Sequence, residues 1–357
     1  MARVAIGLDI GTSGVRAAQV GVAKAPMTLD GFGQYALARG AIQDGEIVDP
    51  GVVSEALGQL WKHARLKSKK VVVGVANQKV VVRPIDLPYM PEEELRGAIQ
   101  YQVQEYIPIP VEDAVLDFQI LDEYVTEGNE RMMRVLLVAA QKDMIGNLMA
   151  AVEGAGLDPV AVDVTALALV RSLGSRGDGL GGSGAGEAII DIGGGITNVV
   201  VHEAGVTRFV RILLTGGHSI TDSLASGLGI SFEEAEGIKQ RQGIAADSAS
   251  AASATESAAQ ILEQRASAFV DEIRGTLDYY AAQADAIQIS RVVLCGGGSK
   301  LTNLGTRLAE ATRLSVERGQ VMQRMKVGKL GLSQEQLADA EPLMGAAVGL
   351  AMGENDQ

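Results

Sequence analysis

The chain has 357 residues, enough for two domains, and 47% of them are hydrophobic against 21% charged, as in a packed globular protein. Its net charge of −13 argues against nucleic acid as a partner. We find no apolar run of about 18 residues and no signal peptide, so we expect neither secretion nor direct membrane insertion. A single cysteine, Cys295, lies in an apolar run, which suits a buried packing residue in a reducing, cytoplasmic compartment.

The chain opens with an apolar run that ends in Asp9, followed by a glycine-rich turn and a second apolar run. This pattern predicts a β-hairpin over about residues 3–22. Glycines in such a turn allow backbone N–H groups to approach an anion closely. We therefore expect Gly11, Thr12, Ser13 and the nearby Arg16 to contact a phosphate.

Three predicted elements follow, and then a block of about residues 78–160 with the order β-α-β-β-α-β. The block lies between two similar hairpins, so it reads as a subdomain inserted into the first domain, which we place at residues 1–185. The elements are strands near 31–38, 71–76, 79–87, 115–121, 133–140 and 160–164, and helices over 50–65, 91–106 and 142–155.

The second hairpin nearly duplicates the first. An apolar run ends in Asp191, a turn contains Gly193, Gly194 and Gly195, and a further apolar run begins at Thr197. We expect these glycines and the threonine to bind phosphate as well. The duplication marks a second domain, placed at residues 186–357, behind a Gly/Ser-rich linker at 173–187.

The second domain contains two other features with functional potential. A strand ending in Gly296, Gly297 and Gly298 leads through Ser299 into a predicted helix, an arrangement that suits a nucleoside and its phosphates. Residues 225–285 form a predicted subdomain on the nucleotide side, with an Ala/Ser tract at 245–259 and a long helix over 257–284. Glu236 and Lys239 share a helix face there and either contact a ribose or form a solvated ion pair.

Asp9 and Asp191 both stand at a strand end before a phosphate-type turn. Mg²⁺ prefers one or two carboxylates together with phosphate oxygens and water. The two hairpins, facing each other, would therefore hold a nucleotide triphosphate and its Mg²⁺, with Asp9 and Asp191 as metal ligands and candidate catalytic residues.

The three glycine-rich motifs, in this order and each after an apolar strand, resemble the actin-like ATPase superfamily, which includes actin, the seventy-kilodalton chaperones, MreB, FtsA and sugar kinases. The resemblance covers nearly the whole chain. It implies an α/β, ribonuclease H-like two-domain fold with ATP and Mg²⁺ in the cleft between the domains.

Three segments narrow the resemblance: LPYMPEEEL at 87–95, QEYIP at 104–108 and LDF at 116–118 are similar to the PilM family of type IV pilus assembly. That likeness implies docking of the cytoplasmic tail of PilN, a membrane protein, and so a place at the cytoplasmic face of the inner membrane. Other pilus assembly proteins and a second copy of the chain are further candidate partners.

A partner groove is expected beside the inserted subdomain. Tyr101, Tyr106, Ile107 and Pro108 lie at the end of its first helix, where an apolar surface would meet the body of the protein. Either they pack in the core of that helix or part of this surface receives a short peptide.

One departure bears on catalysis. MreB and the chaperones carry an acid that positions water in a segment where this chain has Asp163-Val164-Thr165. Val164 stands at the expected position of the acid, so we predict nucleotide binding with slow hydrolysis. The alternatives are a filament-forming relative of FtsA or MreB and a carbohydrate kinase, although no acidic sugar-site motif occurs between the hairpins.

Overall fold

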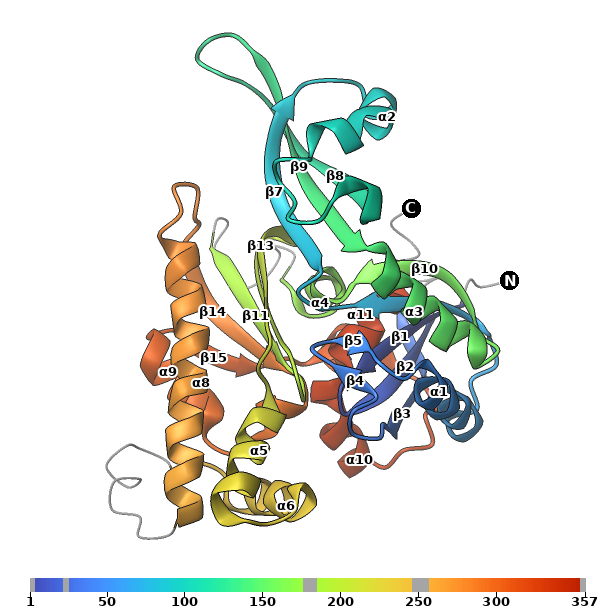
Figure 1. Cartoon of the computed structure of the whole chain (residues 1–357), viewed down its shortest axis with the longest axis vertical. Helices are drawn as coiled ribbons and strands as arrows, with labels where there is room; N and C mark the ends of the chain where they lie inside the picture. The colour runs from blue at the N-terminus through green and yellow to red at the C-terminus, as the bar shows by residue number, and fades with distance from the viewer. Residues whose placement is uncertain (1–3, 22–25, 176–184, 246–256, 354–357) are drawn as a thin grey trace.

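The computed structural model describes residues 4–21, 26–175, 185–245 and 257–353. Two open sheets lie side by side, and a small third sheet projects from one end of the molecule (Figure 1). Each large sheet begins with a meander of three antiparallel strands and continues into parallel strands. The predicted α/β class and the duplicated hairpins are confirmed.

The first sheet has two faces covered by helices. Residues on one face of the sheet contact α1 (Pro50–Ala64), and those on the other contact α11 (Gly345–Gly353). Helix α3 (Lys142–Gly154) packs on α1, and α4 (Thr165–Leu173) packs on α11. The strands run in the order β10 (Asp158–Val164), β6 (Lys70–Val75), β1 (Val4–Gly11), β2 (Gly14–Gly21), β3 (Thr28–Ala36) and β16 (Lys326–Val327).

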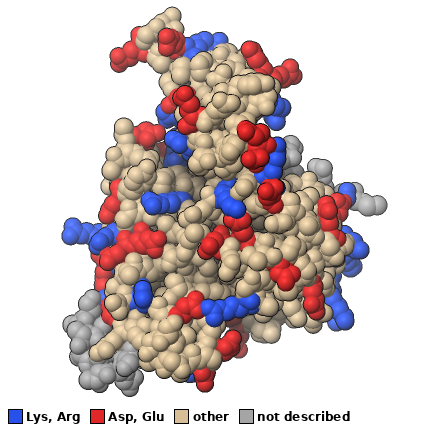
Figure 2. Space-filling model, viewed as in Figure 1, with Lys and Arg blue, Asp and Glu red and all other residues tan. Residues whose placement is uncertain are grey.

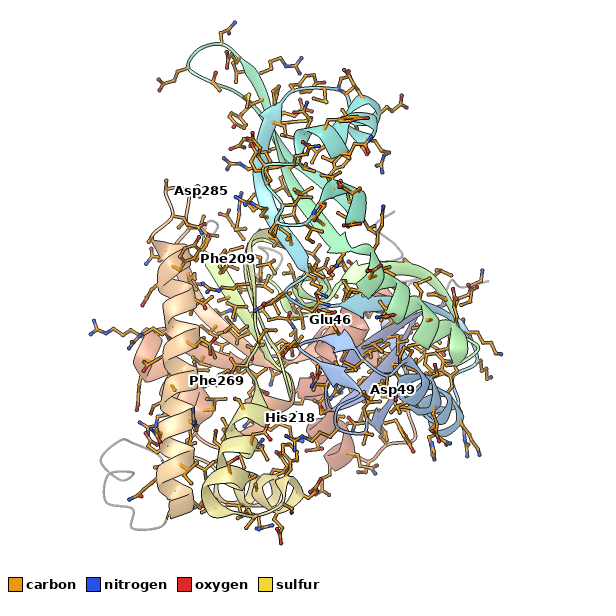
Figure 3. The ribbon with its side chains drawn as sticks, viewed as in Figure 1. Glu46, Asp49, Phe209, His218, Phe269 and Asp285 are labelled. Atoms are coloured by element: carbon orange, nitrogen blue, oxygen red, sulfur yellow. The ribbon has the colours of Figure 1, made fainter. Side chains whose placement is uncertain are left out.

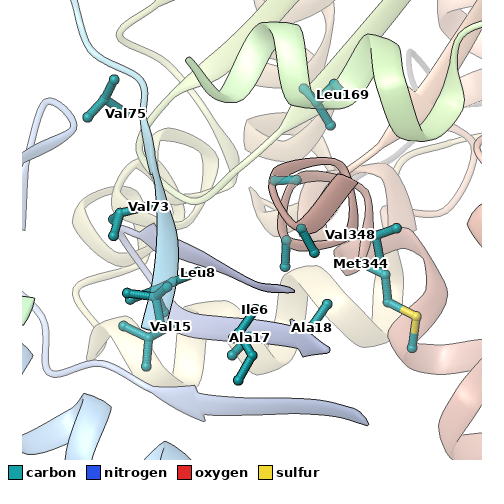
Figure 4. Packing of buried hydrophobic residues seen from close by; sticks show 14 of the residues in the cluster. Ile6, Leu8, Val15, Ala17, Ala18, Val73, Val75, Leu169, Met344 and Val348 are labelled. Carbon is teal, nitrogen blue, oxygen red and sulfur yellow. The ribbon is translucent and has the colours of Figure 1, made fainter. Parts of the chain in front are cut away.

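Helix α11 makes the closest contact with this sheet. A Cβ on Gly7 of β1 would overlap the backbone of Ala347, and a Cβ on Gly349 would overlap that of Ala168 in α4. Figure 4 shows Met344 and Val348 packed near Ile6 and Ala18 of the sheet. The chain therefore returns to the first sheet at β16 and α11, which corrects the expected extension of the second domain to residue 357.

The second sheet has the order β13 (Val206–Leu213), β12 (Thr197–Glu203), β11 (Gly186–Ile192), β14 (Ile289–Cys295) and β15 (Ser315–Arg318). A separate buried core joins it to its helices. These are α5 (Gly217–Leu228), α6 (Phe232–Gln242), α8 (Ser257–Ala281) and α9 (Leu304–Thr312). The predicted linker at 173–187 and the tract at 245–259 fall largely outside the described residues.

The projecting unit consists of β7 (Val80–Pro88), α2 (Glu92–Gln102), β8 (Ala114–Val125) and β9 (Arg131–Gln141), with its own buried core. The predicted order of elements is present along the chain. However, α3 and β10 join the first sheet, so the unit that stands apart is shorter than residues 78–160. Helix α2 ends at Gln102 rather than near Tyr106.

Short elements complete the described part of the chain. No helix within it is long and apolar enough to cross a membrane. The short elements are β4 (Ile42–Gln43), β5 (Glu46–Ile47), α10 (Gln334–Ala340) and the 3-10 turns η1 (Val111–Asp113), η2 (Gly297–Lys300), η3 (Val321–Arg324) and η4 (Glu341–Leu343).

Candidate nucleotide-binding cleft

The glycine-rich turns of the two hairpins face each other across the domain boundary. We name residues 11–14 the first phosphate turn and residues 193–196 the second. A Cβ on Gly195 would lie 2.7 Å from Thr12 Oγ1. The start of α5 holds the second turn, because the N–H groups of Gly217 and His218 donate to the carbonyls of Gly193 and Gly194 at 2.9 and 2.8 Å. Two sets of backbone groups thus border one narrow space.

Asp9 and Asp191 stand at the floor of this space. Asp9 lies opposite Arg16 in the β1–β2 register, and the two side chains form an ion pair at 3.2 Å. Asp191 accepts a hydrogen bond from Asn198 Nδ2 at 3.1 Å. The thiol of Cys295 lies 3.8 Å from the other oxygen of Asp191.

Burial makes this a costly place for two anions. It raises the pKa of Asp191 to about 6, with the neighbouring charge of Asp9 adding to the shift and the Asn198 hydrogen bond opposing it. Burial also raises the pKa of Asp9, against the lowering effect of Arg16. A bound cation would relieve both carboxylates.

The residues present fit a nucleotide with Mg²⁺. Thr12 Oγ1 and Asn198 Oδ1 are buried without a hydrogen-bond partner. Both residues line the same space as Asp9 and Asp191, so these two polar atoms are available to hydrogen-bond a bound ligand. Among the described residues no group of three His, Cys, Asp or Glu side chains could hold a metal. Asp9 and Asp191 would therefore hold Mg²⁺ only together with phosphate oxygens and water, as Mg²⁺ prefers.

The space opens into a cleft of about 1030 Å³ between the two domains. Most residues predicted to bind the nucleotide line this cleft or its inner end. They are Asp9, Gly11, Thr12, Ser13, Arg16, Asp191, Gly193, Gly194, Glu236, Lys239, Gly296, Gly297 and Gly298.

Three predicted residues do not line it and instead support the turns. Thr197 is fully buried and donates its hydroxyl to the carbonyl of Thr215 at 2.8 Å. Ser299 donates to the carbonyl of Gly296 at 2.7 Å. Gly195 packs against Thr12.

Glu236 and Lys239 belong to a mostly buried network. Lys239 Nζ donates to Glu236 Oε2 at 2.7 Å, to Thr221 Oγ1 at 2.8 Å and to the carbonyl of Gly217 at 2.9 Å. The ion pair is therefore not a solvated one. It joins α6 to α5 while both residues still border the cleft.

The sequence analysis missed several cleft residues, notably Asn198, His218, Phe232 and Arg39. Figure 3 shows His218 on the side of the second domain that faces the first. Burial and the charge of Lys239 lower the pKa of His218. Gly216 and Gly217 precede His218 and follow shortly after the end of β13 at Leu213, so this glycine pair resembles the other glycine-rich turns and could have signalled the position.

Val164, at the position expected for a water-positioning acid, lies immediately before α4 as its N-cap residue. It is buried, and its N–H donates to Asp163 Oδ1 at 2.7 Å. Asp163 also pairs with Arg171. The contacts of both residues therefore stabilise the N-terminal end of α4. Thr165 is the residue of this segment that lines the inner end of the cleft.

The four residues expected to form the partner surface differ in their burial. Ile107 is 7% exposed and lies in the core of the projecting unit, with Tyr106 packed against it. Tyr101 is 72% exposed on α2, and Pro108 is exposed. Figure 2 shows that uncharged side chains cover much of the projecting unit on the face in view.

Comparisons with known proteins agree with this geometry. A family model described as type IV pilus assembly protein PilM matches residues 7–355. A solved PilM–PilN type IV pilus biogenesis complex is similar with a TM-score of 0.81 and 25% identity over 98% of both chains. MreB5 of Spiroplasma citri bound to ADP has a TM-score of 0.55 and 15% identity, covering 99% of both chains, which shows the fold.

Cell division protein FtsA is also related. The Bacillus subtilis protein is 25% identical over 263 residues, which cover 67% of this chain and 58% of FtsA. The Streptococcus pneumoniae protein is 28% identical over 258 residues, or 66% of this chain and 55% of FtsA. The chain thus spans little more than half the length of these relatives, and its actin-like fold is confirmed.

Proposed function

The chain belongs to the PilM family of type IV pilus assembly proteins, and we propose that it is an ATP-binding actin-like scaffold that docks the cytoplasmic tail of a PilN-like membrane protein. One observation carries this proposal. The likeness to the chain solved as a PilM–PilN complex covers 98% of this chain, and so extends over the projecting unit as well as both domains.

The cleft supports ATP with Mg²⁺ as the ligand. Asp9 and Asp191 would share the hydrated metal, and the backbone of the two phosphate turns would bind phosphate oxygens. Glu236 and the glycines 296–298 border the part of the cleft suited to the nucleoside. Structural neighbours of the same fold bind ADP and AMPPNP.

The segment at Val164 supports slow turnover. A valine side chain cannot hydrogen-bond a water, and the nearby Asp163 carboxylate is engaged by Arg171 and by the Val164 N–H. ATP would then stabilise a closed arrangement of the domains, with hydrolysis as a minor activity. The sequence between the two hairpins contains no acidic sugar-site motif, which disfavours the sugar-kinase alternative because a kinase needs a carboxylate base near the acceptor hydroxyl.

The partner would bind beside the projecting unit and would hold the protein at the cytoplasmic face of the inner membrane. Tyr101 is the most exposed large aromatic side chain described in the protein, and exposed tyrosines are common anchors in protein interfaces. Other pilus assembly proteins and a second copy of the chain remain further proposed partners.

The test is binding of a synthetic peptide with the cytoplasmic tail sequence of the source organism's PilN-like protein, measured by calorimetry with and without Mg²⁺-ATP. We expect binding to the unaltered chain and a loss of at least about tenfold, or 1.4 kcal/mol, in Tyr101→Ala. Tyr279→Ala is the matched control, because Tyr279 is 58% exposed on α8. Absence of peptide binding together with ATP-dependent sedimentation would instead support a filament-forming protein.

A further inference from the structure

Arg39 reaches from the first domain to the second across the mouth of the cleft. It lies in the turn that follows β3. Its guanidinium carbon is 4.1 Å from the centre of the Phe232 ring at the start of α6, and it forms an ion pair with Asp222 of α5. One side chain thus contacts two helices of the opposite domain.

Each end of this bridge is connected to a phosphate turn. Two residues before Arg39, the N–H of Leu37 donates to the carbonyl of Ser13 in the first phosphate turn at 3.2 Å. On the other side, the Phe232 ring packs edge-on against His218 with centroids 5.2 Å apart. The His218 ring in turn lies so close to Gly194 of the second turn that a Cβ there would be 2.9 Å away.

We propose that Arg39 is a positioning residue that latches the two domains together and thereby sets the rate at which bound nucleotide leaves the cleft. The nucleotide part of this inference rests on the proposed function. Arg39, Phe232 and His218 all line the cleft, so separation of Arg39 from its partners widens the space that the nucleotide occupies.

The chemistry suits a latch that opens and closes. Arg39 is 55% exposed and Asp222 is 47% exposed, and exposed ion pairs and cation–π contacts are individually weak. Arginine can do both at once, because its planar guanidinium stacks on a ring while its N–H groups bind a carboxylate. A lysine would keep the charge but lose the stacking plane.

The first experiment measures release of a fluorescent ATP analogue with Mg²⁺ in a stopped-flow instrument. We expect Arg39→Gln and Asp222→Asn each to accelerate release about three- to tenfold, from the usual strength of such contacts. The double variant should release no faster than Arg39→Gln, because the pair acts as one unit. Arg274→Gln is the matched control, since Arg274 forms an ion pair of similar exposure with Asp271 on α8.

The second experiment needs no nucleotide. Spin labels on Lys62→Cys of α1 and Gln264→Cys of α8, both exposed positions, report the separation of the domains, while the native Cys295 is buried. We expect Arg39→Gln to broaden the distance distribution toward longer values. An unchanged distribution and unchanged release would overturn the latch. Failure of the analogue to bind the unaltered chain, with the distance change still present, would reject the proposed function and leave the latch standing.

Discussion

Gly195 and Thr12 touch across the domain boundary, since a methyl group on Gly195 would lie 2.7 Å from Thr12 Oγ1 and 3.1 Å from its Cγ2. Gly195→Ala should therefore hold the two phosphate turns apart. We expect Mg²⁺-ATP affinity to fall about tenfold or more, equivalent to about 1.4 kcal/mol, as measured by calorimetry. Normal affinity in this variant would show that the turns need not meet to bind ATP.

Gly58→Ala provides the control for that substitution. Gly58 is exposed in the interior of α1, and nothing lies within 4 Å of the position its Cβ would take. Alanine there should raise the free energy of unfolding by about 0.5–1 kcal/mol, because glycine is a poor helix former. ATP affinity should not change.

Asp191→Asn should maintain or raise the thermal stability of the protein while it lowers the affinity for Mg²⁺-ATP. The amide retains the shape of the carboxylate and removes the charge whose burial raises the pKa of Asp191 to about 6. At pH 7.5 we expect an equal or higher melting temperature without ligand, and Mg²⁺-dependent ATP affinity lower by well over about tenfold. The gain in stability should shrink toward pH 5, because there the native Asp191 takes up a proton and the charge disappears in the unaltered protein as well. Unchanged ATP affinity would show that Asp191 is not a metal ligand.

Magnesium-dependent binding should weaken in acid for the same reason. Above pH 7 the Asp191 carboxylate is ionised, whereas at pH 5 a group with a pKa of about 6 is about nine-tenths protonated. We expect the Mg²⁺-dependent part of the ATP affinity to fall about tenfold between these values. Asp191→Asn reports the pH dependence of the nucleotide itself, and an equal slope in both proteins would exclude Asp191 as the titrating group.

Hydrolysis should be slow. With Val164 at the start of α4 and Asp163 bound to Arg171, we expect phosphate release far below the roughly 1–100 s⁻¹ of kinases. A coupled phosphate assay at saturating Mg²⁺-ATP measures it, with Asp191→Ala to identify contaminating activity. Turnover within the kinase range that disappears in Asp191→Ala would contradict the scaffold.

The elements with a strong local pattern could be predicted. Both hairpins combine an apolar run, an aspartate and a glycine turn, and the structure brings their turns together. Strand alternation could also have corrected one site residue. Asn198 lies opposite Asp191 in the register, so its neighbour Thr197 points to the other face of the sheet.

Other features depend on contacts between segments far apart in the sequence, so no local sequence pattern predicts them. In the sequence, α3 and β10 complete the β-α-β-β-α-β order of the inserted block. In the structure, however, α3 packs against helix α1, and β10 pairs with β6 of the first sheet. Helix α11 is apolar on all sides, so its periodicity does not indicate which domain it joins. Arg39 and Asp222 are 183 positions apart, and neither stands in a motif.

The position of α11 has a consequence for the order of folding. Residues 345–353 fill the space between β1 and α4, where Gly7 and Gly349 leave room only for a helix backbone. Along the chain, β11 to β15 come after β1 and before α11, so a ribosome makes the whole second sheet before the helix that completes the core of the first domain. In chains truncated before residue 326, we therefore expect the second domain to resist a protease and the first domain to be cleaved.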